Sequence, residues 1–448
     1  MASSTLQRIL KLIAWTLGIF FFLLMATLTR VDRSPLENNT FYQETLATVD
    51  TMDFSPATGA SWKVGWGKTN ATPETAATLV GYKPRGKYHF VQDSSFVRSL
   101  LISNGKASVA ILNYELMIIH PHLYNRVKEA VKEAKLPIDY LYFTATHTHS
   151  GIGGYMPGLV GKFAFGGYDE RIVQMLVDST INSIKKAIDQ SEEAEIAFQK
   201  ITSDSLVANR LIPEDPIDPV IRILKFKTGS GKKGSFITFN GHPTILAANF
   251  MGLSGDFPHY LMDMLEEQED FAMYAAGTVG SHRPIANGNQ PKDALSYAEA
   301  LFQQITSAGE EKIDVNLSHQ LSLDQVPMKL RNPHLRISER TRIRPWIFNT
   351  LVGDTNNHLD RVQIGNLLLI GSSGELSGVF MPQWEEYANR NGLNLMVTCF
   401  NGGYIGYITP DEYYDLPLYE ARDMNWFGPY NGAYFDQMIK KLITPQSK

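Results

Sequence analysis

The amino-acid sequence predicts a mixed α/β (α+β) fold, in which a single large domain with central β-sheet and flanking helices follows an N-terminal membrane segment. Short apolar runs of strand length alternate with segments of helical periodicity, and a longer apolar run lies near the start of the chain. The 448 residues are 44% hydrophobic and 19% charged, which is typical of a globular protein with a large core.

The apolar run near the N-terminus is Leu12–Leu28, with Arg8 and Lys11 before it and two arginines after it. At about 1.5 Å per residue it is just long enough to cross a bilayer as a helix. A cleaved signal peptide has the same charge layout, but Ala26-Thr27-Leu28 is a poor match to a small-x-small cleavage site. We therefore expect residues 1–33 to form a signal anchor, with the large domain on the extracytoplasmic side, periplasmic or extracellular.

Residues 34–60 are polar and predict a tether, whereas residues 61–448 contain no repeat or obvious linker and predict one domain. The strand candidates in this domain are Phe96–Ile102, Ala107–Leu112, Tyr140–Ala145, Ile221–Phe226, Ser235–Phe239, Val362–Ile370 and Leu395–Cys399. The clearest helical segments are Pro121–Ala134, Glu170–Gln190, Pro258–Glu267 and Asp293–Gln304.

Charge and cysteine content exclude several classes of function. The net charge is −5 and no long basic stripe is present, so nucleic-acid binding has no electrostatic support. The lone Cys399 cannot form an internal disulfide or a cysteine-rich zinc site, and we expect it to be a small buried apolar side chain. Any metal must therefore be held by His, Asp, Glu or Tyr.

The strongest local signal is Thr144-Ala145-Thr146-His147-Thr148-His149-Ser150-Gly151, which follows an apolar strand. Two histidines separated by one residue point to opposite faces of a regular strand, but at a strand end the chain can turn and bring both to one site. Neutral imidazole suits zinc, so the pair is either a set of metal ligands or a pair of structural histidines.

A second signal is Asn240-Gly241-His242-Pro243, where the proline favours an extended His242 at the end of a strand. Taken alone, His242 could equally be a turn residue. Asp256 follows in a turn into a helix, where we expect it to cap that helix rather than to support a site.

Two further segments carry polar side chains after apolar strands. Glu375 follows the glycine-containing turn Gly371-Ser372-Ser373-Gly374, and with two histidines it would complete a zinc pattern that leaves a position open for water. Tyr407 lies in Asn401-Gly402-Gly403-Tyr404-Ile405-Gly406-Tyr407, and Tyr419-Glu420 follows; tyrosine hydroxyls can bind a metal or donate to an oxyanion.

These segments occur in the order that the neutral/alkaline ceramidase family shows, and from about Asn70 to about Leu442 the chain resembles a divergent member of that family. The resemblance implies a zinc-dependent amide hydrolase that cleaves a ceramide-like N-acyl amide lipid into fatty acid and amine. It implies zinc ligation by His147, His242, Glu375 and Tyr407, contact of His149 and Tyr419 with the amide carbonyl oxygen, and an active-site arginine at Arg210. The partners we expect are a lipid or N-acyl amide substrate and the membrane, with no protein partner and no nucleic acid.

Two features depart from the family pattern. The family places a serine implicated in catalysis where this chain has Arg283, within Val279-Gly280-Ser281-His282-Arg283-Pro284. Either Ser281 or His282 could take over the role of that serine, or Arg283 could bind an anionic group of the substrate. The chain is also too short for the additional C-terminal β-sandwich domain that family enzymes often carry.

Three functions remain open at this point. The first is hydrolysis of an N-acyl amide lipid, with or without an acidic head group. The second is hydrolysis of another polar amide or ester on the same fold. The third is a catalytically inactive, membrane-tethered lipid-binding protein, against which the retained His147, His242, Glu375 and Tyr407 argue.

Overall fold

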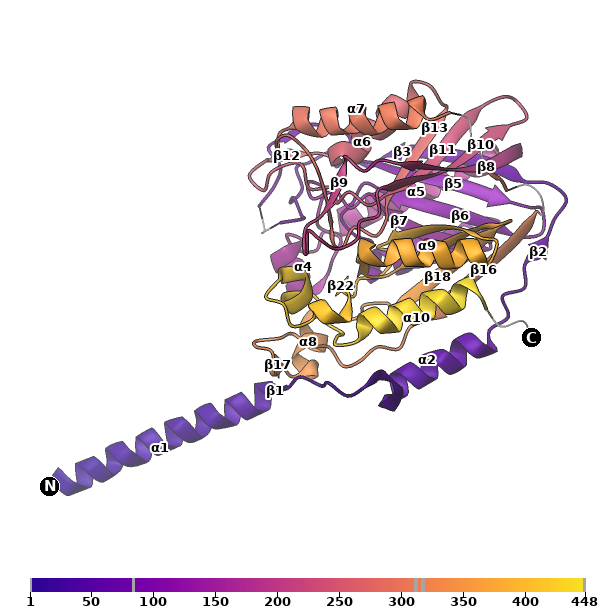
Figure 1. The fold of residues 1–448 in the computed structure, drawn as a ribbon. Helices are drawn as coiled ribbons and strands as arrows, with labels where there is room; N and C mark the ends of the chain where they lie inside the picture. Colours follow the sequence, from indigo (N-terminus) through magenta and orange to yellow (C-terminus); the bar gives the residue numbers. More distant parts are fainter. Residues whose placement is uncertain (1, 83–84, 310–312, 316–318, 446–448) are drawn as a thin grey trace.

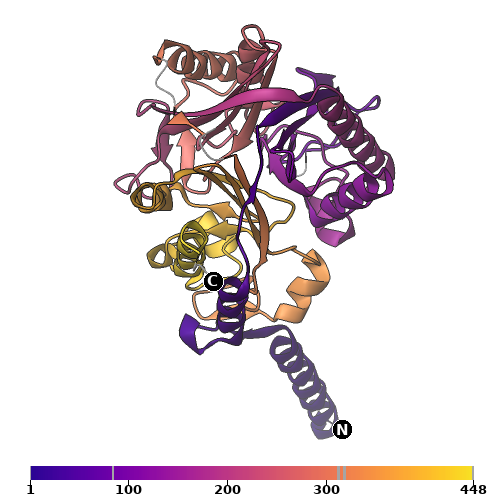
Figure 2. The same ribbon diagram turned by 90° about the vertical axis from the view of Figure 1, so that its right-hand side faces the viewer.

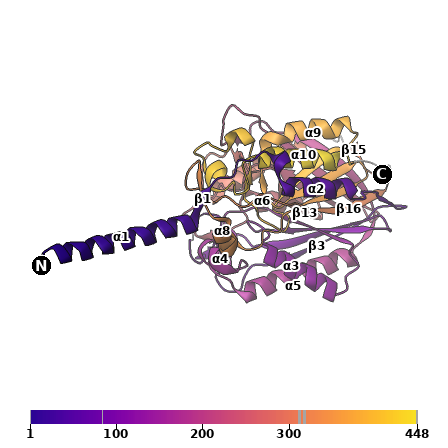
Figure 3. The same ribbon diagram turned by 90° about the horizontal axis from the view of Figure 1, so that it is seen from below.

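The computed structural model describes residues 2–82, 85–309, 313–315 and 319–445. Two β-sheets pack face to face and helices cover their outer faces, so the domain has four layers (Figures 1 and 3). The mixed α/β fold expected from the sequence is confirmed.

The larger sheet has nine strands in the order β13–β11–β10–β8–β3–β5–β6–β7, with β15 also pairing with β8. The pairs β6–β7 and β11–β13 are parallel, and the other pairs of this sheet are antiparallel. The strands are β3 (Lys63–Asn70), β5 (Phe96–Ser103), β6 (Ser108–Tyr114), β7 (Tyr140–Ala145), β8 (Glu192–Thr202), β10 (Val220–Thr228), β11 (Lys233–Phe239), β13 (Phe271–Ala276) and β15 (Ile313–Asp314).

The smaller sheet has five strands in the order β2–β16–β18–β19–β21, of which only the β19–β21 pair is parallel. These strands are β2 (Ala57–Thr58), β16 (Gln320–Pro327), β18 (His358–Ile364), β19 (Leu367–Ser372) and β21 (Asn394–Cys399). The expectation of one strand over Val362–Ile370 is wrong, because β18 and β19 form a hairpin that turns at Gly365, whose φ is +57°. Both strands are almost wholly buried, and the turn between them is Gly365-Asn366, a residue pair typical of a two-residue hairpin loop.

The core between the sheets contains side chains from both, such as Leu100 of β5, Phe236 of β11 and Leu369 of β19. On the outer faces, α3 and α5 lie over the larger sheet, α6 and α7 cover its β13 side, and α9 and α10 lie over the smaller sheet (Figure 3). These helices are α3 (Pro121–Glu133), α5 (Glu170–Asp189), α6 (Asp256–Glu266), α7 (Pro291–Ser307), α9 (Met381–Arg390) and α10 (Asn431–Ile443). The four helices expected from periodicity are therefore confirmed.

The N-terminal apolar segment is a single exposed helix, α1 (Ala2–Thr27), which projects from the domain (Figure 1). Its part Thr5–Thr27 is long and apolar enough to cross a membrane. Two short elements continue from it towards the domain, β1 (Leu28–Arg30) and its antiparallel partner β17 (Thr341–Ile343).

Residues 34–60 do not form the polar tether expected from composition. They contain α2 (Thr40–Thr51) and β2, and in Figure 2 the indigo segment runs from α2 across the molecule to β3. Tyr42 and Val49 of α2 are buried, and the Tyr42 hydroxyl donates to Gln437 of α10. The periodic apolar positions of this short helix therefore outweigh its polar average, and the segment packs as part of the domain.

Candidate metal centre and active site

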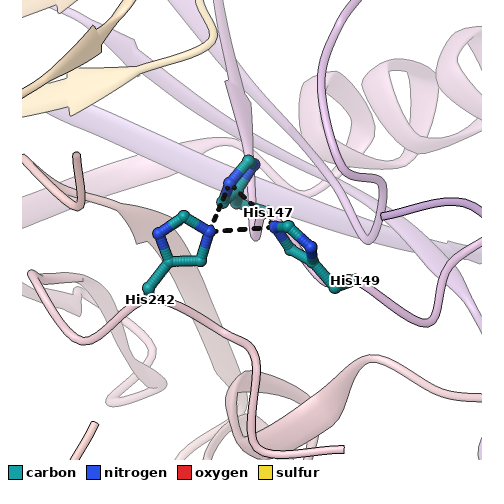
Figure 4. A group of neighbouring side chains, drawn as sticks. All are labelled: His147, His149 and His242. Carbon is teal, nitrogen blue, oxygen red and sulfur yellow. Dashed lines mark hydrogen bonds between the residues drawn. The ribbon is translucent and has the colours of Figure 1, made fainter. Parts of the chain in front are cut away.

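Three histidines converge at the edge of the sheets where β7 and β11 end. His147 and His149 follow β7, and His242 follows β11. The Nε2 atoms lie 3.0 Å apart for His147 and His242, 3.2 Å for His147 and His149, and 2.9 Å for His149 and His242 (Figure 4). Tetrahedral zinc ligands bound at about 2.0–2.1 Å are separated by a similar distance.

The contacts of the three Nδ1 atoms determine which nitrogen of each histidine carries the proton. Nδ1 of His147 lies 2.6 Å from the carbonyl oxygen of Met117, Nδ1 of His149 contacts that of Gly81, and Nδ1 of His242 lies 3.2 Å from that of Val279. A carbonyl oxygen only accepts, so each Nδ1 carries the proton and each Nε2 presents a lone pair. Three lone pairs facing one another repel unless a cation lies among them, which is the arrangement of a metal site.

The rings are uncharged in this environment. Burial lowers the pKa of His149 to about 3, with the charge of Arg210 acting in the same direction. Burial also lowers the pKa values of His147 and His242 well below the ordinary range. Neutral imidazole is the form that binds a metal or accepts a proton.

A carboxylate and a phenol lie beside the histidines. The short strands β20 (Glu375–Leu376) and β22 (Tyr407–Ile408) pair in parallel with Glu375 opposite Tyr407. Glu375 Oε1 accepts a hydrogen bond of 2.7 Å from the Tyr404 hydroxyl. Its Oε2 is buried, has no hydrogen-bond partner among the described residues and lies 3.8 Å from His147 Nε2. Burial raises the pKa of Glu375 to about 7. An unpartnered buried carboxylate oxygen next to three imidazole lone pairs fits a metal ion.

Arg210 is adjacent to this group. Its Nη2 donates to the Tyr407 hydroxyl over 3.2 Å, and its Nε lies 3.3 Å from Glu420 Oε1. Burial opposes its charge, but Tyr407, Glu420 and Glu375 together raise the pKa of Arg210 above its ordinary value. Tyr419 lies at the rim with its ring centroid 6.3 Å from that of Tyr407, and its side chain is 56% exposed.

Backbone strain supports the position of His147. Its φ is +64°, a left-handed conformation that is uncommon outside glycine. The His147 ring stacks on the ring of Phe400, with the two ring centroids 3.9 Å apart. Phe400 also has a left-handed backbone conformation, with φ of +68°. Gly81 is needed for the opposite wall, because a Cβ there would lie 2.4 Å from the Cα of His149.

The group opens into a cavity of about 1090 Å³. His147, His149, His242, Glu375, Tyr407, Tyr419 and Arg210 all line it. The other walls are largely apolar and come from several elements: Met117, Ile118, Met156, Val160, Ala164, Phe165, Val352, Met424 and Trp426. A polar group at one wall of a large apolar cavity is the usual form of a site for a ligand with an apolar body.

Two sequence-predicted catalytic residues do not line this cavity. Arg283 is exposed in β14 (His282–Pro284), which pairs with β9 (Val207–Asn209). Ser281 is buried: its Oγ accepts from the Ser377 hydroxyl and the Gly378 N–H, and it lies 2.9 Å from His282 Nδ1. His282 Nε2 accepts from the backbone N–H of Asp218, so its Nδ1 carries a proton and cannot activate the Ser281 hydroxyl.

Asp256 also stays outside the cavity. It is the first residue of α6, after the N-cap Gly255, and its carboxylate accepts from the backbone N–H groups of Leu246 and Phe257. The first of these bonds holds the loop that follows His242. The N-cap position is thus Gly255 rather than Asp256, and the Asp256 carboxylate binds one N–H of the first helical turn and fixes a site-bearing loop.

Sequence reasoning missed three residues that shape the site. Phe400 and Tyr404 contact His147 and Glu375, and Arg85 lines the cavity and donates to the carbonyl oxygen of His149. An aromatic or arginine residue in a loop gives no local signal of its role. Cys399 is buried, as expected.

Comparison with known proteins agrees with this architecture. Residues 62–281 match the family model described as neutral/alkaline non-lysosomal ceramidase, N-terminal. The neutral ceramidase of Pseudomonas aeruginosa is 25% identical over 261 residues, which cover 52% of this chain and 39% of that protein, so the match spans well under half of that protein's length.

Solved structures share the fold. The crystal structure of neutral ceramidase from Pseudomonas aeruginosa aligns with a TM-score of 0.72 at 19% identity, covering 86% of this chain and 74% of the other. A structure described as ceramidase complexed with C2 aligns with a TM-score of 0.71 at 17% identity, covering 86% of this chain and 75% of the other. Residues 62–281, just under half of the chain, are therefore similar to the N-terminal part of the neutral/alkaline non-lysosomal ceramidase family.

Proposed function

We propose that the chain is a zinc-dependent hydrolase of linear amides that cleaves an N-acyl amide lipid, ceramide-like in form, into a fatty acid and an amine. The observation that carries the proposal is the convergence of three imidazole lone pairs and the unpartnered oxygen of Glu375 at the wall of an apolar cavity. We propose α1 as the membrane anchor, with the domain on the extracytoplasmic side.

His147, His242, Glu375 and Tyr407 would hold the zinc ion. When bound, zinc supplies Lewis acidity towards a carbonyl oxygen and lowers the pKa of a water molecule. The Tyr404 hydroxyl orients Glu375, and Arg210 neutralises the negative charge that gathers around Glu375, Tyr407 and Glu420.

His149 and Tyr419 act on the substrate side. His149 is less buried than His147 and His242, and its Nε2 lone pair accepts rather than donates. It would therefore take a proton from a water molecule in the cavity, and it is not set up to donate to the amide carbonyl oxygen as the family resemblance implies. Burial raises the pKa of Tyr419, so its hydroxyl keeps the proton that it would donate to the developing oxyanion.

The cavity also favours a substrate with an anionic group. Arg85 donates 3.1 Å to the carbonyl oxygen of Phe250 and 2.7 Å to that of Val80. Among the described residues no carboxylate forms an ion pair with it, whereas Arg210 pairs with Glu420. An arginine in the cavity wall without a counter-charge would bind a carboxylate or phosphate near the scissile amide. Arg85, rather than Arg283, would thus bind an anionic group of the substrate.

The test is fatty-acid release from purified full-length protein, with ceramide and N-acyl amino acids compared. Release that a chelator abolishes and added zinc restores supports the proposal. Arg85→Met should raise KM for N-acyl amino acids more than KM for ceramide, with Arg85→Lys intermediate. Release that is insensitive to chelation would contradict zinc dependence, and no release with any amide or ester would favour the binding-protein alternative.

A further inference from the structure

Outside α1, the most exposed large apolar side chains lie on two short helices, next to β17 and at the rim of the cavity. Within the described ranges, five of them are more than half exposed: Leu159 (53%), Phe163 (67%), Ile337 (58%), Trp346 (58%) and Tyr419 (56%). Leu159 and Phe163 lie on α4 (Gly158–Ala164), and Trp346 lies on α8 (Pro345–Val352). Ile337 precedes β17, and Tyr419 is at the cavity rim. Such a patch on a soluble surface usually marks an interaction site.

The helices α4 and α8 are also walls of the cavity. Val160 and Ala164 of α4 and Val352 of α8 line it, and the two helices pack against each other. Each helix therefore turns one side to the cavity and exposes large apolar side chains on another. A ligand bound to the exposed side chains of these helices would therefore lie next to the apolar wall of the cavity.

The same region is fixed to the end of α1. The Arg344 backbone N–H donates 2.8 Å to the carbonyl oxygen of Thr27, its Nε donates 2.8 Å to that of Met25, and Trp346 Nε1 donates 3.4 Å to that of Ala26. These donors satisfy carbonyl groups that the last turn of a helix leaves without partners. Figures 1 and 3 show α4 and α8 at the end of the domain from which α1 projects.

We propose that the α4–α8 patch, formed by Leu159, Phe163, Ile337 and Trp346, lies in the interface of the bilayer that α1 crosses, so that the cavity takes its substrate directly from the lipid layer. The occupant of the patch is lipid, because the apolar helix bound to α8 ends there and Trp346 is the residue type that favours a membrane interface. The proposal rests on the proposed lipid substrate, and it names the route by which that substrate reaches the site.

The first experiment measures insertion without any catalytic readout. Cys399 is buried in the folded protein, so Phe163→Cys can be labelled with an environment-sensitive fluorophore in the full-length protein. In phosphatidylcholine nanodiscs we expect blue-shifted emission that spin-labelled lipid quenches. Lys232→Cys is the control, because β11 runs from Lys233 to the site and its beginning lies at the opposite edge of the sheet. Emission equal to the control, or blue-shifted emission that lipid does not quench, would overturn the proposal, the latter in favour of a protein or a second copy on the patch.

The second experiment separates access from chemistry. The double variant Leu159→Asp/Phe163→Asp should lose about ten-fold or more of kcat/KM for a long-chain amide in bilayers, because burying these side chains favours membrane contact. Its kcat/KM for a short-chain, water-soluble amide should match the unmodified protein. Leu295→Asp, at an exposed position on α7, should change neither value. Equal losses on both substrates would overturn the proposal, while the unmodified protein's own release of fatty acid tests the proposed function separately.

Discussion

Within the part of the chain that the structure describes, two groups of side chains have the residue types of a metal site, and they are built in opposite ways. His147, His149 and His242 point three lone pairs at one place, with the unpartnered Glu375 oxygen beside them. The second group consists of Asp93, Glu115 and His259.

In the second group, the side chains form ion pairs with one another and with neighbouring residues. His259 donates 2.9 Å from Nδ1 to Glu115 and lies 3.1 Å from Asp263 through Nε2, and Arg98 also pairs with Glu115. Burial opposes the charge of His259, but Glu115, Asp263 and Asp93 raise its pKa to about 10. A protonated imidazole has no lone pair for a metal. The comparison teaches that ligand residue types indicate a metal site only where their donor atoms are left without partners.

The largest expected effect is the loss of zinc and activity when a histidine of the first group is replaced. His147→Ala removes one converging lone pair, so the protein should lose its bound zinc and at least about a thousand-fold of its fatty-acid release. His259→Ala should keep the zinc. Elemental analysis of both purified variants checks this, and zinc retained by His147→Ala but lost by His259→Ala would reverse the assignment.

The second group should instead support stability. His259→Ala removes one of the two cations that face Glu115 and the cation nearest Asp93, and breaking such a buried network costs about 3–5 kcal/mol in the free energy of unfolding. Chemical denaturation monitored by tryptophan fluorescence measures it. A loss under about 1 kcal/mol would show that Arg98 alone neutralises these carboxylates.

A smaller effect concerns the oxyanion. Tyr419→Phe removes a hydroxyl donor at the cavity rim, so kcat should fall by about a hundred-fold while zinc content stays the same. Tyr168→Phe, at another partly exposed tyrosine, is the control. Unchanged kcat in Tyr419→Phe would remove this residue from the mechanism.

The pH dependence of stability follows from His259. Its pKa in the folded protein, about 10, is raised above the ordinary value of 6.5, so its stabilising contribution is complete below pH 6.5 and is lost as the pH rises through 10. The difference in the free energy of unfolding between the unmodified protein and His259→Gln should therefore shrink between pH 7 and pH 10. A difference that stays constant over this range would mean that His259 is neutral.

The smallest effect is expected at Ser281. Its Oγ accepts hydrogen bonds from Ser377 and Gly378 away from the cavity, so Ser281→Ala should cost about 1–3 kcal/mol of stability through unpaired buried donors. The kcat of the folded variant should stay within a few-fold of the original. Loss of activity with unchanged stability would restore Ser281 as a catalytic residue.

The sequence predicts those parts of the molecule that local patterns encode. Apolar runs located β5, β6, β7, β10, β11 and β21, and the motifs at their ends placed His147, His242, Glu375 and Tyr407 around one cavity. What failed depends on packing between distant segments. The polar average of residues 34–60 hid the three buried positions of α2. The β18–β19 hairpin differs, because its turn Gly365-Asn366 is a local signal that the apolar runs on both sides outweighed.

The same limit applies within the site. Alignment of Arg283 with a family serine predicted a residue in the cavity, but its place in β14 turns the side chain to solvent. Conversely, Arg85 gave no signal, because only the three-dimensional arrangement brings it to the carbonyl oxygen of His149. The tautomers of the three histidines depend on the carbonyl groups of Met117, Gly81 and Val279, which are distant in sequence.

Zinc binding beside His147 and His242 is tested most directly by anomalous diffraction at the zinc absorption edge from crystals of the full-length protein. We predict one peak, among the Nε2 atoms of His147 and His242 and the carboxylate of Glu375. A peak at Asp93, Glu115 and His259, or well-ordered crystals grown with zinc that show no peak at the three histidines, would contradict the account.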